Sequence, residues 1–423
     1  MGQSGMRSSI RSVTAGEVAV GLVILALGLG ACSMAPYRYE PLDATAVTQR
    51  AIAQEQGAFV VRASVPGEEE ARKIFGFPIY KRGIQPVWLE ISNTGSKRAR
   101  VILSSIDEDY FSPLEVAYMH KKHFSKEGWL DMEKYLHASA LPRQIAPNET
   151  ASGFVFTHTS NGTKAFNLDI FYAEVEPEYE QFTFFVEVPG FVPDHASVDF
   201  RNLYRPEEIR TVDRETLAEL LGEIPCCTTN HDGSAQGRPA QLFFVADPRD
   251  LLRALLRAGW NETSYVRDAR YQASADYLFG RPPDAIFRKG RDKTTERAEL
   301  GLWLAPAIVD GKALWVGQFK HAIGRRYAVG ELFLGVTLDP DANDGRNYVL
   351  QDLWYAQSLQ HWAWSDSGKL VPQDAPESDF HGNPWFSVDS YRLALWVSGA
   401  PVDLAAATPI DWGEFQPLRD EQP

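Results

Sequence analysis

The feature that most constrains the fold is an alternation of apolar and polar residues that recurs through residues 57–200. Val87, Leu89 and Ile91 share one face of an extended segment, and the turn signal Asn93-Thr94-Gly95 follows them. Successive side chains of a β-strand point to opposite faces, so a strand with one buried face shows this period of two. Residues 57–200 therefore predict a β-sandwich of immunoglobulin-like type, built from six or more short strands.

Two segments interrupt the alternation and are expected to be helical, residues 68–75 and residues 113–137. The second contains His120 and His123, a spacing at which two imidazoles can share a metal ion. Lysines occupy both positions between them and would repel a cation. We therefore interpret this segment as a solvated basic face.

The pattern changes between residues 206 and 415 to a mixture of helical and extended segments. The clearest signal is a buried strand at residues 241–246 followed by a helix, with Asp247 before it, Pro248 at its first position and Gly259 after its end. Further strands are expected at residues 284–289, 300–305, 314–321, 361–364 and 391–398, and helices at 213–221 and 345–357. The chain is thus predicted to be a multidomain α+β protein, with residues 416–423 as a tail.

The composition is that of an ordinary globular protein, with 44% hydrophobic and 23% charged residues in 423. This balance excludes a collagen, a coiled coil and a largely disordered chain. The formal net charge is −14, whereas a surface that binds nucleic acid needs clustered Lys and Arg. No nucleic acid partner is expected.

The amino terminus carries the pattern of an export signal. A basic start precedes an apolar run at residues 18–27, which is too short to span a membrane but suits a secretory signal. The run closes on Leu29-Gly30-Ala31-Cys32, which resembles a bacterial lipobox. This resemblance implies a lipoprotein signal peptide at 1–31, lipidation of Cys32 and a lipidated tether at 32–56. Ser33, where inner-membrane lipoproteins have Asp, implies a periplasm-facing protein at the outer membrane, with the membrane as its partner.

The folded part retains two cysteines, Cys226 and Cys227, which are adjacent in the sequence. Three states are open to them in an oxidising periplasm: buried thiols, a vicinal disulfide, or a site for a soft metal ion. A disulfide between neighbours is rare because ordinary bridges join Cα atoms 4.4–6.8 Å apart. We therefore expect buried or turn-bound thiols.

Several blocks between residues 217 and 412 occur in the order and spacing of one known family. They include Ile224-Pro225-Cys226-Cys227, Tyr277-Leu278-Phe279-Gly280-Arg281, Leu338-Asp339-Pro340-Asp341 and Gln351-Asp352-Leu353. With them the chain resembles the LssY C-terminal domain (LssY-like) proteins over nearly half of its length. The resemblance implies an envelope-associated accessory domain at 206–415, linked to secretion or envelope lipid handling, and supplies no catalytic residues.

This chain departs from the family's usual pattern at two places. The family usually has Ser-Arg-Asp where this chain has Phe319-Lys320-His321. It usually has Val-Asp-Glu-Ala-Arg where this chain has Ala342-Asn343-Asp344-Gly345-Arg346. No charge-based site is therefore carried over from the family to these positions.

The acidic run that begins at Asp339 resembles the start of a calcium-binding loop. A calcium loop needs Gly at its sixth position and Glu at its twelfth, but counting from Asp339 these are Asp344 and Leu350. The run is better interpreted as a turn that caps the next helix. No metal site and no cofactor are predicted.

The sequence contains no complete catalytic motif: no Gly-x-Ser-x-Gly elbow, no His-Glu-x-x-His and no phosphate-binding loop. Arginines and aspartates of the second domain are the best candidates for a binding cleft, since Arg binds carboxylate or phosphate through two parallel hydrogen bonds. The candidates are Arg281, Asp284, Arg297, Asp339, Asp341 and Arg346. The favoured function is a noncatalytic accessory lipoprotein that binds an envelope protein or lipid; the alternative is an envelope hydrolase acting on a lipid or glycan.

Overall fold

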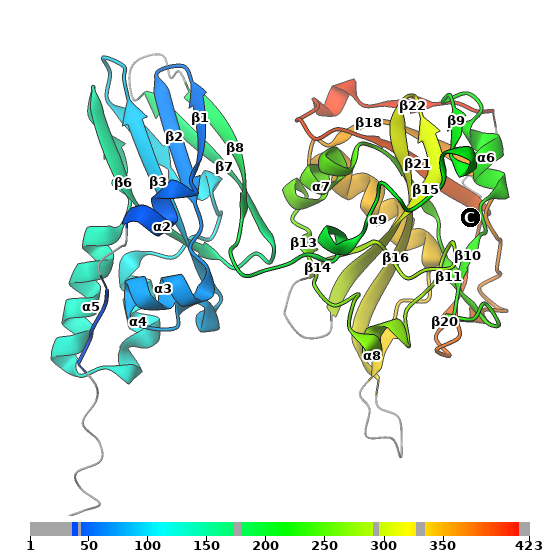
Figure 1. Ribbon diagram of the computed structural model, residues 1–423, viewed down its shortest axis with the longest axis horizontal. Coiled ribbons are helices and arrows are strands. Elements are labelled where there is room, and N and C mark those ends of the chain that lie inside the picture. The colour runs from blue at the N-terminus through cyan, green and yellow to red at the C-terminus, as the bar shows by residue number, and fades with distance from the viewer. Residues whose placement is uncertain (1–35, 41–43, 173–178, 291–295, 327–334, 414–423) are drawn as a thin grey trace, which may run out of the picture.

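The computed structural model describes residues 36–40, 44–172, 179–290, 296–326 and 335–413, which form two domains side by side (Figure 1). The predicted signal peptide, Cys32 and the tail at 416–423 lie outside the described residues. Within the described part, no helix is both long and apolar enough to cross a bilayer.

The first domain is built from two antiparallel four-stranded sheets with a shared apolar core. One sheet has the order β1 (Ile52–Gln56), β2 (Phe59–Ser64), β3 (Ile84–Asn93), β6 (Glu149–His158), and the other has β5 (Gln144–Ile145), β4 (Ala99–Ile102), β7 (Thr163–Tyr172), β8 (Tyr179–Glu187). Buried residues alternate with half-buried ones along all of β7, as the sequence predicted. Leu89 from one sheet and Leu168 and Phe184 from the other are completely buried in the core.

The predicted tether at 32–56 is wrong from residue 44 onward, because this part of the chain is folded. It forms α2 (Ala44–Gln49) and then β1, which pairs along its whole length with β2. The side chain of Gln54 donates a hydrogen bond to the carbonyl of Thr183 at 2.8 Å. A polar strand at the edge of a sheet keeps its side chains in solvent, so it lacks the apolar alternation that reveals other strands.

The two predicted helical segments of the first domain are confirmed as α3 (Glu68–Phe75), α4 (Pro113–His120) and α5 (Lys126–Ser139). They lie together at one end of the sandwich over a second apolar cluster (Figure 1). The expectation of a solvated basic face is wrong for His120, which is 2% exposed. Its ring packs on Phe77, and its Nδ1 lies 2.9 Å from the carbonyl oxygen of Val116, so the imidazole is a core residue.

The second domain is organised around a mixed ten-stranded sheet. Its main path runs β13 (Asn261–Glu262), β14 (Ala285–Gly290), β15 (Glu296–Val309), β16 (Lys312–Arg326), β12 (Leu242–Val245), β21 (Tyr391–Val397), β18 (Leu359–Asp366), β22 (Thr408–Ile410), with β17 (Gly335–Leu338) paired to β16 and β9 (Arg210–Val212) to β15. Two small hairpins stand apart, β10 (Cys227–Thr229) with β11 (Gln236–Pro239) and β19 (Glu377–Ser378) with β20 (Pro384–Trp385). The α+β character expected for this region is confirmed.

Helices cover both faces of this sheet. The apolar sides of α7 (Pro248–Arg257) and α9 (Ala342–Tyr355) pack in one core cluster, and α6 (Leu217–Glu223) packs in the other. The short α8 (Ala269–Gln272) lies near the end of β16 (Figure 1). Gly345 sets the distance of α9 from the sheet, since a Cβ at this position would collide with the ring of Phe319 on β16.

The two domains meet where β7 and β13 begin. The backbone N–H of Thr163 donates to Oε2 of Glu262 at 2.7 Å, and the N–H of Asn161 donates to Oδ1 of Asn261 at 3.1 Å. Gly162, at φ +77°, leaves no room between these contacts, since a Cβ there would collide with the Glu262 carboxylate. A buried glutamate therefore fixes the position of the first domain against the second.

Candidate functional site

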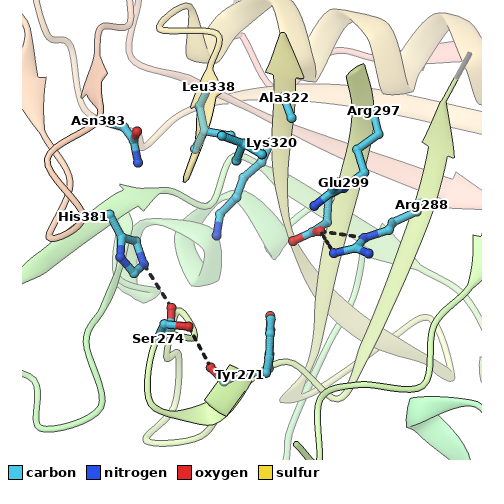
Figure 2. A pocket seen from close by; sticks show the side chains of 11 residues that line it. Tyr271, Ser274, Arg288, Arg297, Glu299, Lys320, Ala322, Leu338, His381 and Asn383 are labelled. Carbon is cyan, nitrogen blue, oxygen red and sulfur yellow. Dashed lines mark hydrogen bonds and ion pairs between the residues drawn. The ribbon is translucent and has the colours of Figure 1, made fainter. Parts of the chain in front are cut away.

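A cavity of about 480 Å³ opens on one face of the sheet formed by β14–β17. The strand register places Arg288 opposite Glu299 and Glu299 opposite Lys320, so charges of alternating sign cross three neighbouring strands. Figure 2 shows these side chains on one side of the cavity, with His381 and Ser274 across from them. The remaining lining residues are Tyr271, Arg297, Ala322, Val336, Leu338 and Asn383.

The first pair in this row is Arg288 with Glu299. Nε of Arg288 donates to Oε2 of Glu299 at 2.9 Å, and the hydroxyl of Tyr265 donates to the same oxygen at 3.0 Å. Burial tends to raise the pKa of Glu299, but the positive charges of Arg288 and Lys320 outweigh it and hold that pKa below its ordinary value. The carboxylate is therefore kept ionised in a position fixed by two donors.

The second pair is Lys320 with Asp276, a residue that is 3% exposed. Thr228 donates its hydroxyl hydrogen to Oδ1 of Asp276 at 2.8 Å, and Nε2 of Gln318 donates to the Thr228 oxygen at 2.9 Å. Burial tends to raise the pKa of Asp276, but Lys320 and the Thr228 hydroxyl lower it below the ordinary value. Lys320 thus reaches the cavity from a buried polar network that fixes its ammonium group.

The polar groups on the opposite wall are already engaged with the backbone. The hydroxyl of Ser274 donates to the carbonyls of Arg270 and Tyr271 at 3.3 and 3.2 Å, and Nε2 of His381 lies 3.0 Å from the Ser274 carbonyl oxygen. Among the lining residues that the structure describes, no hydroxyl is hydrogen-bonded to an imidazole or a carboxylate. A serine or tyrosine hydroxyl is activated as a nucleophile by such a neighbour.

Arg281 and Asp284, two of the predicted site residues, lie outside this cavity. Nε and Nη2 of Arg281 donate to the two oxygens of Asp284, each at 2.9 Å. The guanidinium also donates to the Tyr204 hydroxyl and the Leu304 carbonyl, both at 2.7 Å. The structure thus places this pair as a buried clamp between β14, β15 and the segment that joins the domains.

Arg346 is also held in a structural pair. It donates to both carboxylate oxygens of Asp389 at 2.8 Å, and its guanidinium lies 4.8 Å from the centre of the Trp364 ring. This clamp ties α9 to the segment before β21, so Arg346 has a structural role here.

Asp339 and Asp341 lie together before α9, apart from the clamps. Oδ1 of Asp341 accepts from the N–H groups of Asn343 and Asp344 at 2.9 and 3.3 Å, which confirms the predicted helix cap. Asp339 accepts in turn from the N–H of Asp341 at 3.0 Å. Of the six predicted site residues, Arg297 alone lines the cavity, while the structure brings in three that sequence reasoning missed, Arg288, Glu299 and Lys320.

Cys226 and Cys227 form a vicinal disulfide, with their Cα atoms 3.7 Å apart. The expectation of free thiols is therefore wrong. The Cys226 carbonyl is held by the N–H of Ala240 at 2.8 Å, and Cys227 packs in a small apolar cluster with Val371 and Trp385. The hydrogen bond from Ala240 and the apolar cluster hold the turn after α6 from two sides, so the disulfide lies against buried side chains.

Comparison with known families gives one match, which lies within the second domain. Residues 221–387 match the family described as LssY C-terminus, and this range contains every residue that lines the cavity. No curated protein gives a significant match to the chain. The match agrees with the sequence blocks that carried the resemblance, and the domain that holds the charged cavity is an LssY-like C-terminal domain.

Proposed function

We propose that this protein is a noncatalytic lipoprotein of the cell envelope whose LssY-like domain binds a ligand carrying a phosphate or carboxylate group. The observation that carries this proposal is the charged cavity on β14–β17. Two of its cations, Arg288 and Lys320, are held in place by Glu299 and Asp276 before any ligand arrives. A binding site whose side chains are already ordered loses less conformational entropy when the ligand binds.

The charges around the cavity favour an anion. Arg288, Arg297 and Lys320 line it against one carboxylate, that of Glu299. Even when the buried Asp276 is counted with Lys320, the three cations exceed these two acids by one. A guanidinium offers two parallel N–H donors to a planar carboxylate or a phosphate, which suits an envelope lipid headgroup or an acidic peptide.

The first domain is proposed to be an immunoglobulin-like spacer. With β1 set aside, strands β2, β3 and β6 form one sheet and β5, β4, β7 and β8 the other. If β2 is counted as the first strand, the second strand (β3) pairs with the fifth (β6), the third (β4) with the sixth (β7), and the sixth with the seventh (β8). Immunoglobulin-type sandwiches have the same pairing. A rigid module of this kind would hold the LssY-like domain away from a lipid anchor.

The anchor is proposed at Cys32, on the outer membrane and facing the periplasm. The support is the sequence pattern, a basic start, a short apolar run and a lipobox that ends in Cys32. Metabolic labelling with a fatty acid tests it directly. We expect Cys32→Ala to abolish acyl labelling, whereas a variant that is still labelled and fractionates with the outer membrane would contradict the anchor.

The binding proposal is tested by titrating the full chain with glycerol 3-phosphate and with acetate, which are soluble probes for the two anions. We expect one site for at least one probe, weakened about 10-fold by Arg297→Ala, the loss expected when one charge-assisted contact is removed. Arg205→Ala is the matched control, since Arg205 is exposed and pairs locally with Glu208. Absence of binding, or equal weakening by both variants, would overturn the proposal.

The alternative, an envelope hydrolase acting on a lipid or glycan, makes a different prediction in the same experiment. A hydrolase would turn over a panel of phospholipids or glycans, and Arg297→Ala would remove turnover while leaving the fold intact. Turnover of that kind would replace the accessory function with the enzymatic one.

A further inference from the structure

We propose that His321, Asp339 and Asp344 form a binding site for a divalent transition-metal ion such as Zn²⁺. Each residue offers one ligand atom, and the three atoms lie within 4.8 Å of one another. The site lies on the opposite face of β16 from the anion cavity and goes beyond the binding function proposed above.

The fold brings the three residues together from three different elements. His321 is on β16, and Asp339 follows β17, with its N–H bonded to the His321 carbonyl at 2.8 Å. Directly opposed residues of neighbouring strands point to the same face of a sheet. The two side chains are therefore neighbours, with Nδ1 of His321 3.9 Å from Oδ2 of Asp339.

Asp344 is supplied by the first turn of α9, which packs over this face of β16. The next residue is Gly345, where the helix lies so close to Phe319 that no side chain fits. This close approach carries the carboxylate of Asp344 to within reach of the other two ligand atoms. The capping bonds of Asp341 fix the same turn, so the helix delivers Asp344 in a defined position.

The ligand atoms are open to an ion. Oδ1 of Asp339 accepts from the N–H of Asp341, whereas Oδ2 is the oxygen that faces His321. His321 and Asp344 also line a cavity of about 600 Å³. The nearby Lys289 is paired with Asp352 at 2.5 Å, so its charge is compensated away from the site.

The donor set indicates the class of ion. Imidazole favours zinc and its transition-metal neighbours, and carboxylates are compatible with them, whereas calcium takes six to eight oxygen ligands. Bonds of about 2.0–2.2 Å would draw the three side chains inward around the ion. Three protein ligands leave at least one coordination position for water or for a ligand that enters the cavity.

The test is isothermal titration of the full-length protein with Zn²⁺, and separately with Ca²⁺. We expect one equivalent of Zn²⁺ to bind, and His321→Ala and Asp344→Asn each to weaken binding by at least about 10-fold, since even outer-shell changes at metal sites cost that much. His361→Ala is the matched control, because His361 bonds to Thr408 elsewhere on the sheet. Asp344 is exposed, so its variant keeps the fold.

A second readout does not depend on titration heats. Zn²⁺ should raise the melting temperature of the parent protein and of His361→Ala, and raise that of Asp344→Asn by less at the same Zn²⁺ concentration, because a ligand stabilises the fold in proportion to how tightly the folded state binds it. The proposal is overturned if Zn²⁺ does not bind, if both ligand variants bind it as tightly as the parent, or if Ca²⁺ alone binds.

Discussion

The two domains fill their interiors in different ways. Apolar side chains such as Leu168 and Phe184 dominate the core between the sheets of the first domain, although the charged Lys164 is also buried there. The second domain buries more charged side chains, among them Asp276, Asp284 and Arg392. Buried ion pairs contribute little net stability because desolvation opposes their attraction. The comparison indicates that the first domain relies mainly on apolar packing, whereas the second holds more charges in fixed positions, some of them beside its cavity.

The largest expected effect is on a buried pair of the second domain. Arg281→Ala leaves the Asp284 carboxylate buried without its guanidinium partner, which costs about 3–5 kcal/mol of unfolding free energy. Urea unfolding followed by tryptophan fluorescence measures it. Arg205→Ala, at an exposed local pair, should change stability by no more than about 1 kcal/mol. If Arg281→Ala lost as little unfolding free energy as Arg205→Ala, the buried and the exposed ion pair would not differ in their effect on stability.

The matching change in the first domain removes apolar volume. Leu168→Ala leaves a cavity in a fully buried position, and we expect a loss of about 2–5 kcal/mol. Leu168→Met, which conserves volume, should cost less than about 1.5 kcal/mol. Differential scanning calorimetry should show the loss in the transition of the first domain. If the melting transition of the second domain shifted instead, the stabilities of the two domains would be coupled.

A smaller effect is expected from the vicinal disulfide. Reduction with dithiothreitol opens a two-residue loop, and such a short loop restricts the unfolded chain by only about 1 kcal/mol. Cys227→Ser should destabilise the second domain by a similar free energy, which lowers its melting temperature. Mass spectrometry of alkylated protein reports the redox state. A loss above about 3 kcal/mol would show that the disulfide holds the α6–β10 turn far more strongly than loop length predicts.

The smallest effect is expected at the junction of the domains, where burial raises the pKa of Glu262. A carboxyl group with a raised pKa in the folded state adds stability below its unfolded pKa of about 4.3 and loses it as pH rises through the folded value. Glu262→Gln removes this dependence and should make the protein more stable at pH 7, by less than the changes described above. The gain should vanish near pH 4. Urea midpoints across this range measure it, and a variant less stable at pH 7 would contradict the prediction.

Much of the fold was accessible from local patterns in the sequence. The helix predicted at residues 68–75 has the same bounds in α3, and the strand and helix around Asp247 appear as β12 and α7. These elements have a clear apolar period and strong end signals. β1 was missed because both of its faces are largely exposed, so its sequence reads as a polar linker.

The site was less accessible because its contacts are distant in the sequence. Arg281 and Asp284 stand three residues apart and look like a binding pair, but the fold uses them to bond each other. Lys320 and Asp276 are separated by 44 residues, and no spacing rule joins them. The available signal for the cavity was Lys320 in the strand that contains the apolar run Leu314-Trp315-Val316. The vicinal disulfide depends on how a turn is held by Ala240, which the sequence does not reveal.

The junction between the domains also determines which substitutions the chain can accept during evolution. Its hydrogen bond to Glu262 comes from the main chain of Thr163, so any residue that has an N–H can occupy that position. Gly162 has no such freedom, because every other side chain would strike the carboxylate. Random mutagenesis under selection for a folded protein should therefore accept many residues at 163 and retain glycine at 162. The orientation of the two domains therefore depends on the absence of a Cβ atom at position 162.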